Sequence, residues 1–316
     1  MSAGIPFLDA SDVEALLTPT AAVDALRRAL AGGFRPETDH ARIFEQLDGG
    51  EFLLMPAETA TSTGIKVLTI APDNPARGLA RIQGLYVLFD SATLSPRALI
   101  DGPALTDIRT SAVSVAAIRD ALERDAGTLN IVVFGAGPQA RAHVRTVRAV
   151  LEGTRLVGSV TSVVRSPARV TTGADFDAVV AAGSEEAVAA TRAAGLILCT
   201  TTASSPLFED DVVRDDAVVV AVGSHSPDAR ELPGALLGRS DVIVEDIGAA
   251  LRECGDVVLA IDEGHLAADD LIPMGDLVRG SRGLRGGRPV VFKSAGMSWE
   301  DLVLAQAIAD ADGRRG

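Results

Sequence analysis

The feature that most constrains the fold is a glycine-rich turn at the end of an apolar run. Residues 129–134 read LNIVVF, and the pattern Gly135-x-Gly137-x-x-Ala140 follows them. In such a turn the first glycine lets the strand bend into a helix, and the second lets the backbone approach a pyrophosphate. The third small residue lets helix and strand pack closely. The pattern predicts a dinucleotide-binding unit that begins well inside the chain.

Apolar runs alternate with helix-like segments downstream of this turn. Continuous apolar runs are typical of strands buried on both faces of a parallel sheet. The sequence therefore predicts a doubly wound, parallel-sheet α/β (Rossmann) domain over residues 119–297. The further runs lie at 160–164, 196–200, 217–222 and 241–245, with a helix expected over 184–194.

The first 118 residues have a different pattern. Their strand-like segments follow one another too closely for helical crossovers, which predicts a largely antiparallel or mixed sheet. These segments are 42–47, 51–57, 64–70, 81–90 and 96–101. Two helices precede them, marked by the capping pattern Ser11-x-x-Glu14 and by Thr18-Pro19. Residues 1–118 are expected to form an α+β domain, completed by a C-terminal segment, 298–316, whose first part is an amphipathic helix.

Charge and composition exclude several function classes. A net charge of −14 argues against nucleic acid or anionic membranes as partners. No run approaches the ~20 apolar residues of a membrane span, and the N-terminus lacks the basic region of a secretory signal. Cys199 and Cys254 form no metal-ligand cluster, and the scattered histidines have no metal-site spacing. We therefore expect a cytoplasmic protein that binds a small molecule and no metal.

The cations are distributed unevenly, since Lys66 and Lys293 are the only lysines among 29 basic residues. Base composition accounts for the arginines, whereas a lysine can mark a site that needs a compact point charge. Near the end of the second Rossmann strand, Arg165 and Ser166 occur and no acid precedes Asp175. An arginine there can bind a 2′-phosphate, which favours NADP, with NAD still possible. The alternative is that Arg165 simply faces solvent.

Several stretches together resemble the ornithine cyclodeaminase/mu-crystallin family nearly end to end. They include GIKVLTIAPDNPARGLARIQGLYVLFD, LIDGPALTDIRTSAVSV, FGAGPQARAH, AVGSHSPDARELP and VFKSAGMSWEDLVLAQA, in this order. The resemblance implies that the first domain holds the substrate and the interface of a homodimer. It also implies that Arg42, Lys66 and Arg109 bind a substrate carboxylate, as an arginine fork and a lysine point charge are suited to do. We expect no fixed negative group beside these cations.

The same resemblance and the glycine pattern suggest a set of cofactor contacts. Arg165 and Ser166 would bind the 2′-phosphate, and Lys293 would lie near the nicotinamide. The remaining expected contacts are Thr110, Gly135, Gly137, Pro138, Gln139 and Val222.

One departure from the cyclodeaminases bears on the reaction. His225 stands where those enzymes have an acidic residue, although Asp228 follows three residues later. A histidine can donate or relay a proton near neutral pH but is no fixed anion for the side-chain ammonium of ornithine. The alternative is a loop histidine bonded to nearby backbone. Asp228 and Glu231 are expected to cap the following helix.

These observations predict NAD(P)H-dependent reduction of a cyclic ketimine carboxylate, with His225 and Lys66 as catalytic residues. The substrate would be Δ1-pyrroline-2-carboxylate or Δ1-piperideine-2-carboxylate, and the product L-proline or L-pipecolate. Three alternatives stay open: ornithine cyclodeaminase, an amino-acid dehydrogenase, and ligand binding without turnover as in mu-crystallin. The sequence does not choose the ring size.

Overall fold

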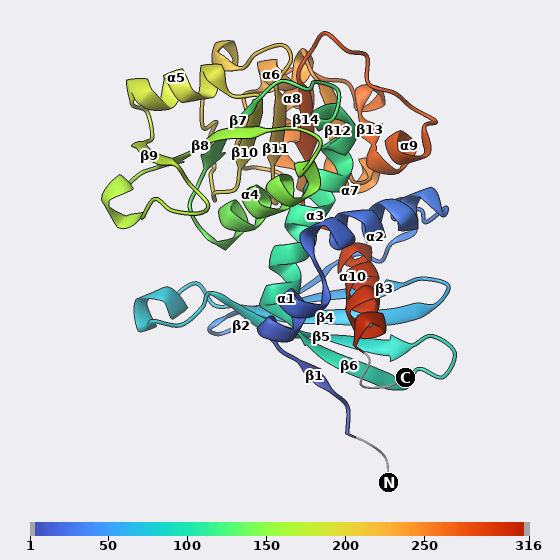
Figure 1. The fold of residues 1–316 in the computed structure, drawn as a ribbon. Coiled ribbons are helices and arrows are strands. Elements are labelled where there is room, and N and C mark those ends of the chain that lie inside the picture. The colour runs from blue at the N-terminus through green and yellow to red at the C-terminus, as the bar shows by residue number, and fades with distance from the viewer. Residues whose placement is uncertain (1–3, 313–316) are drawn as a thin grey trace. The chain divides into compact units, whose positions relative to one another are not determined.

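A computed structural model describes residues 4–312 of the chain (Figure 1). The chain forms two compact units, one comprising residues 1–113 with 297–316 and the other residues 114–296. The division falls inside helix α3 (Gly102–Leu122), whereas the sequence analysis put it between 118 and 119. Because α3 is continuous, no turn residue in the sequence marks the boundary.

The first unit is built on a six-stranded sheet with the order β1-β6-β5-β4-β3-β2. All neighbouring strands are antiparallel except β1 and β6, which are parallel, so the sheet is mixed, as expected. The strands are β1 (Phe7–Leu8), β2 (Ile43–Leu47), β3 (Gly50–Glu58), β4 (Ser62–Ile70), β5 (Ile82–Asp90) and β6 (Pro96–Asp101).

One face of this sheet is buried, and its register places a lysine in the buried row. Met55 lies opposite Lys66, Lys66 opposite Tyr86, and Tyr86 opposite Ile100. All four side chains are buried. Side chains at paired positions share a face, and helix α10 (Ser298–Ala311) packs against β3, β4 and β5. Lys66 therefore sits in the core of the unit rather than at its surface.

The helices of this unit start at well-defined caps, one of which differs from expectation. Helix α1 (Ala10–Leu16) is capped by Asp9, with Asp12 completing the capping box, so the predicted Ser11-x-x-Glu14 pattern was wrong by two residues. An Asp at the N-cap accepts from the backbone as well as a Ser does. Helix α2 (Pro19–Ala31) begins as predicted, with Ala21 N donating to Thr18 Oγ1.

The second unit contains an eight-stranded parallel sheet with the order β13-β12-β14-β11-β10-β7-β8-β9. The predicted doubly wound α/β fold is thus confirmed. Its strands are β7 (Leu129–Phe134), β8 (Val157–Val164), β9 (Ala178–Ala181), β10 (Leu196–Cys199), β11 (Val218–Ala221), β12 (Asp241–Val244), β13 (Ile272–Pro273) and β14 (Val290–Lys293).

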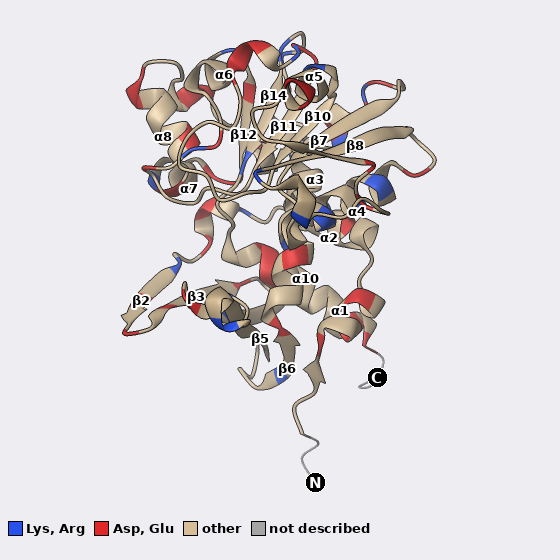
Figure 2. Ribbon diagram, turned by 90° about the vertical axis from the view of Figure 1, so that its left-hand side faces the viewer, with Lys and Arg blue, Asp and Glu red and all other residues tan. Residues whose placement is uncertain are grey.

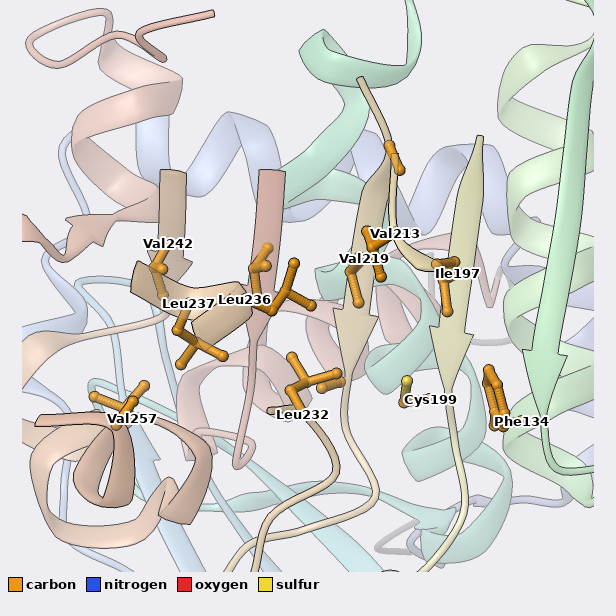
Figure 3. Packing of buried hydrophobic residues seen from close by; sticks show 14 of the residues in the cluster. Phe134, Ile197, Cys199, Val213, Val219, Leu232, Leu236, Leu237, Val242 and Val257 are labelled. Atoms are coloured by element: carbon orange, nitrogen blue, oxygen red, sulfur yellow. The ribbon is translucent and has the colours of Figure 1, made fainter. Parts of the chain in front are cut away.

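Strand β14, which lies between β11 and β12, was not predicted, and neither were the edge strands β9 and β13. The four residues of β14 are all buried, and the last of them is Lys293. The apolar cluster that fills one side of this sheet includes Phe134, Cys199 and Leu232 (Figure 3). The helices of the unit are α4 (Pro138–Leu151), α5 (Glu185–Ala193), α6 (Gly234–Gly238), α7 (Ile247–Glu253), α8 (Gly255–Asp262) and α9 (Met274–Arg279).

Candidate functional site

The glycine turn has the geometry that the sequence pattern requires. Gly135 has φ +123°, a region that disfavours other residues, and its amide donates to Val163 O at 3.0 Å. Gly137 is the N-cap of α4, and a Cβ added there would meet nothing within 4 Å. Gly137 and Pro138 are exposed, while Ala140 is buried. The start of α4 is therefore open to solvent, as an anion-binding helix terminus must be.

The turn also lies at the point where the sheet order reverses. Strand β7 pairs with β8 on one side and with β10 on the other, and in such folds ligands bind at this carboxyl edge. Thr200, directly after β10, donates to Phe134 O from its amide at 3.0 Å and from Oγ1 at 3.1 Å. The sequence analysis placed Thr200 inside the strand, although the run of three threonines after Cys199 is a signal that the strand has ended.

The proposed 2′-phosphate residues follow the neighbouring strand. Phe134 is opposite Val163 in the β7–β8 register, so the segments after both strands share one edge of the sheet. Arg165 and Ser166 are exposed there. Asp175, the first acid downstream, is buried and bound by Arg141 at 2.9 Å and Arg145 at 2.8 Å.

In the first unit, two of the three predicted carboxylate-binding cations lie together, and each has an acidic partner. Lys66 Nζ is 2.7 Å from Asp301 Oδ2, and Arg109 Nη1 is 3.0 Å from Glu300 Oε2. Arg109 Nε is also 3.8 Å from Asp301 Oδ1. The two acids form the acidic first turn of α10, seen in Figure 2. The expectation of no fixed negative group beside the cations was therefore wrong.

Burial shifts the pKa of Lys66 in this cluster. Burial and the charge of Arg109 lower the pKa of Lys66 to about 8, although Asp301 and Glu300 act in the opposite direction. Lys66 Nζ also donates to Thr106 Oγ1 at 3.3 Å. Only a tenth of the Arg109 side chain is exposed, and Lys66 is fully covered. Arg109 is thus the more accessible of the two cations.

Arg42 directly precedes β2, the edge strand of this sheet, whose first residue, Ile43, lies opposite Leu54. The side chain of Arg42 is partly buried. The guanidinium of Arg42 also lies 5.6 Å from the centre of the Phe44 ring.

Two further titratable residues, Tyr86 and Asp39, lie near the cluster. Tyr86 is fully buried opposite Lys66; burial, together with the charges of Asp301 and Asp39, raises its pKa well above the usual value. Asp39 Oδ2 accepts from Trp299 N at 2.9 Å, near the start of α10. Burial raises the pKa of Asp39 to about 6. Sequence reasoning missed both, although Tyr86 is the only tyrosine in the chain.

The loop after β11 carries Val222 and the exposed His225 at the carboxyl edge of the parallel sheet. Lys293, at the end of β14, is fully buried and donates from Nζ to Ser224 O at 2.6 Å. Glu231 is also fully buried. Helix α6 has no side-chain cap, so the expectation that Asp228 and Glu231 cap it was wrong.

Thr110, a predicted cofactor contact, and His143, one of the scattered histidines, bond within their own units. Thr110 Oγ1 donates to Thr106 O at 2.8 Å inside α3. His143 is buried against Ser114 Oγ at 2.9 Å and Gln139 O at 2.8 Å. Within residues 4–312, no group of His, Cys, Asp or Glu side chains is arranged to hold a metal. No helix among these residues is long and apolar enough to cross a membrane.

Comparison with known proteins gives a consistent result. The model of the ornithine cyclodeaminase/mu-crystallin family matches residues 7–313. The chain is 30% identical to a Δ1-pyrroline-2-carboxylate/Δ1-piperideine-2-carboxylate reductase of Azospirillum brasilense, over 97% of this chain and 96% of that protein. It is 31% identical to Δ1-pyrroline-2-carboxylate reductase 1 of Burkholderia multivorans, over 97% of this chain and 96% of that protein.

The fold is likewise shared with a solved structure. The Δ1-pyrroline-2-carboxylate reductase of Thermococcus litoralis, in complex with NADH and L-proline, superposes with a TM-score of 0.84. The alignment covers 97% of each chain at 24% sequence identity.

Proposed function

The chain belongs to the ornithine cyclodeaminase/mu-crystallin family, and we propose that it reduces a cyclic ketimine carboxylate with a nicotinamide cofactor. The observation that carries the proposal is that two buried cations, Lys66 of β4 and Arg109 of α3, lie together at the first turn of α10, where each pairs with an acid. The reductases named above support the reaction type. The products would be L-proline or L-pipecolate.

Charge balance assigns a role to each cation. Lys66 and Arg109 are matched by Asp301 and Glu300, so a substrate carboxylate brings one uncompensated negative charge. Buried charges are tolerated only when they are paired. Arg42, which directly precedes the edge strand β2 of the same sheet, would supply the third positive charge. Arg109, which is partly exposed, would bind the carboxylate as a fork, with Lys66 behind it as a point charge.

The second unit would bind the dinucleotide. Gly135, Gly137, Pro138 and Gln139 would approach the pyrophosphate at the open start of α4, and Thr110 would be a further contact. Arg165 and Ser166 would bind the 2′-phosphate of NADP, and Val222 would line the nicotinamide end. The engagement of Asp175 by two arginines supports NADP over NAD, because this acid is not available for a ribose hydroxyl.

Two residues, His225 and Lys66, would hold the proton on the imine nitrogen. A bound nicotinamide would supply a hydride to C2, which would accept it best with the ring nitrogen protonated. His225 would keep this proton in place, directly or through water. Lys66, with a pKa of about 8, is a second group that can hold a proton near the substrate. The nitrogen retains its proton, and the product is a cyclic secondary amine.

Ornithine cyclodeamination is the second candidate, because one observation favours it. Glu300 and Asp301 are fixed negative groups beside the carboxylate-binding cations, and such groups can attract the side-chain ammonium of ornithine. Both acids are nevertheless engaged by Lys66 and Arg109, which supports reduction as the first candidate.

The outer face of the first unit's sheet supports a homodimer. Ile43 and Leu85 are exposed there, at 50% and 38%, and neighbouring apolar residues on the same face are only half-buried. These neighbours are Leu54, Ile65, Val67 and Val87. We propose that a second copy covers this face, since apolar surface of this kind marks interaction sites. Leu85→Glu would then yield monomers in light scattering, whereas an unchanged mass would contradict the dimer.

One set of assays tests the reaction. NADPH and NADH oxidation would be followed with Δ1-pyrroline-2-carboxylate, Δ1-piperideine-2-carboxylate, and pyruvate plus ammonia, and ammonia release would be followed with ornithine. We expect oxidation of NADPH with one or both cyclic imines. Ammonia from ornithine would favour the second candidate, and nucleotide binding without turnover would indicate a binding protein.

A further inference from the structure

A buried carboxylate, that of Glu231, accepts hydrogen bonds from the loop after β11. Glu231 Oε2 accepts from Gly223 N at 2.7 Å and from Ser224 N at 3.1 Å. Ser224 Oγ donates to Ala229 O at 2.5 Å, which closes the loop on itself. Two successive amides and one hydroxyl of the segment 222–231 are thus fixed immediately before His225.

Lys293 completes this arrangement from a different strand. Its Nζ donates to Ser224 O at 2.6 Å and lies 2.9 Å from Asp256 Oδ2 and 3.6 Å from Glu231 Oε2. Asp256 Oδ1 in turn accepts from the amides of Glu231 and Leu232, both at 2.8 Å. The ammonium therefore has one carbonyl acceptor and two carboxylates within ion-pair distance. We name Lys293, Asp256 and Glu231 the loop clamp.

Two glycines pack closely against backbone next to this loop. A Cβ at Gly223 would overlap Thr201 O, and a Cβ at Gly255 would overlap the carbonyls of Ala229 and Ser226. The backbone therefore packs closely on both sides of the clamp, and only glycine fits at these two positions.

The clamp is charged as well as buried. Burial acts to lower the pKa of Lys293, but the charges of Asp256 and Glu231 outweigh it and raise the pKa. Lys293 consequently stays an ammonium throughout the neutral range, and removing it would leave two carboxylates facing each other in the core.

We propose that Lys293 is a positioning residue for the loop after β11, which carries His225. It acts by fixing the peptide plane that joins Ser224 to His225. The Ser224 carbonyl and the His225 amide belong to one rigid plane, so a hydrogen bond to the carbonyl also orients the backbone that carries the imidazole. The link to catalysis rests on the proposed function of His225. The clamp itself does not depend on that function.

The test compares Lys293→Met with Lys293→Arg and with the control Arg285→Met. Arg285 pairs at 2.8 Å with Asp241, another fully buried carboxylate of the same unit, but outside the loop. The loss of a charge-assisted hydrogen bond predicts at least ~10-fold faster amide exchange across residues 222–231 in Lys293→Met. A misplaced catalytic group predicts a fall in kcat of up to ~100-fold. NADPH affinity, measured by titration, should change less than threefold, roughly, because the clamp touches protein groups only.

Each result decides between defined outcomes. Lys293→Arg should recover part of the exchange protection and of kcat, and Arg285→Met should leave both at the wild-type level in this loop. Loss of NADPH affinity with unchanged amide exchange would overturn the proposal and indicate that Lys293 contacts the cofactor directly. Faster amide exchange with unchanged kcat would also overturn it, because the clamp would then only stabilise the loop.

Two further arms cover the remaining cases. If Lys293→Met does not fold, Asp256→Asn removes one partner with little change of shape and is measured in the same way. If the wild type reduces no imine, the proposed function fails, while the exchange experiment still decides whether Lys293 fixes the loop.

Discussion

Lys66 and Asp301 lie 2.7 Å apart, Nζ to Oδ2, and neither side chain is exposed. One comes from the middle of β4 and the other from the first turn of α10, so residues separated by most of the chain form one buried ion pair. The pair has two consequences, since it joins helix to sheet and it sets the charge of the proposed carboxylate site.

Asp301→Asn should destabilise the first unit. Breaking a buried pair leaves an uncompensated charge and costs ~3–5 kcal/mol of unfolding free energy. Urea denaturation would measure this. Asp310→Asn, on the same helix but with 61% of its side chain exposed, is the control and should be near neutral. Equal stability of both variants would show that the pair contributes little.

Arg165→Ala should discriminate between the two nucleotides. The loss of a charged hydrogen bond to a 2′-phosphate predicts a KM for NADPH higher by ~10- to 100-fold, with the KM for NADH nearly unchanged. Steady-state kinetics with both nucleotides would measure the ratio. Arg169→Ala, exposed four residues downstream, is the matched control. An equal loss for NADH and NADPH would remove Arg165 from the 2′-phosphate site.

Glu231 should make stability depend on pH. Burial raises its pKa in the folded protein from about 4.5 to about 7, so the folded state prefers the protonated acid. Its contribution is fully present below pH 4.5 and is lost as the pH rises through 7, by an amount on the order of 3 kcal/mol.

The comparison with Glu231→Gln isolates this contribution. The wild type should lose stability relative to Glu231→Gln between pH 4.5 and 8 in chemical denaturation, while Glu263→Gln, at an exposed acid bound to Arg230, should not show this dependence. A difference that stays constant over the whole range would mean that Glu231 is ionised in both states.

Gly64→Ala should destabilise the first unit through Tyr86. A Cβ at Gly64 would overlap the Tyr86 hydroxyl and ring, and overpacking of this kind costs ~1–3 kcal/mol. Tyr86→Phe in the same chain should recover part of the loss, because the hydroxyl makes the closest contact. Gly49→Ala, where a Cβ would meet nothing, is the control. Thermal denaturation of these three variants and of Tyr86→Phe alone would suffice, and strictly additive effects would contradict the contact.

The sequence predicted those elements whose cause is local. The glycine turn, the parallel-sheet rhythm and the helix over 298–311 follow from periodicity, caps and the special backbone of Gly135, which act over a few residues. The strand β14 was missed because three apolar residues followed by a lysine do not distinguish a buried strand from a loop.

The acidic partners of the candidate site could not be predicted from the sequence. Lys66 and Arg109 could be selected by resemblance, but Glu300 and Asp301 look in the sequence like acids that favour a helix N-terminus. Their role depends on which sheet face the helix covers, and that is a tertiary fact. The same holds for Glu231. The local sequence suggested that it caps a helix, whereas in the structure it pairs with Lys293, which is distant in the sequence.

The register of β4 restricts where residues can be inserted or deleted in this protein. Positions 62, 64, 66 and 68 face inward and those between them face outward, so deleting one residue between the β3–β4 turn and Lys66 would bring Ile65 or Val67 to the inward position. The ammonium would then leave Asp301 and emerge on the apolar outer face. Insertions and deletions among natural variants should therefore gather in the segment 71–81 and spare the first half of this strand.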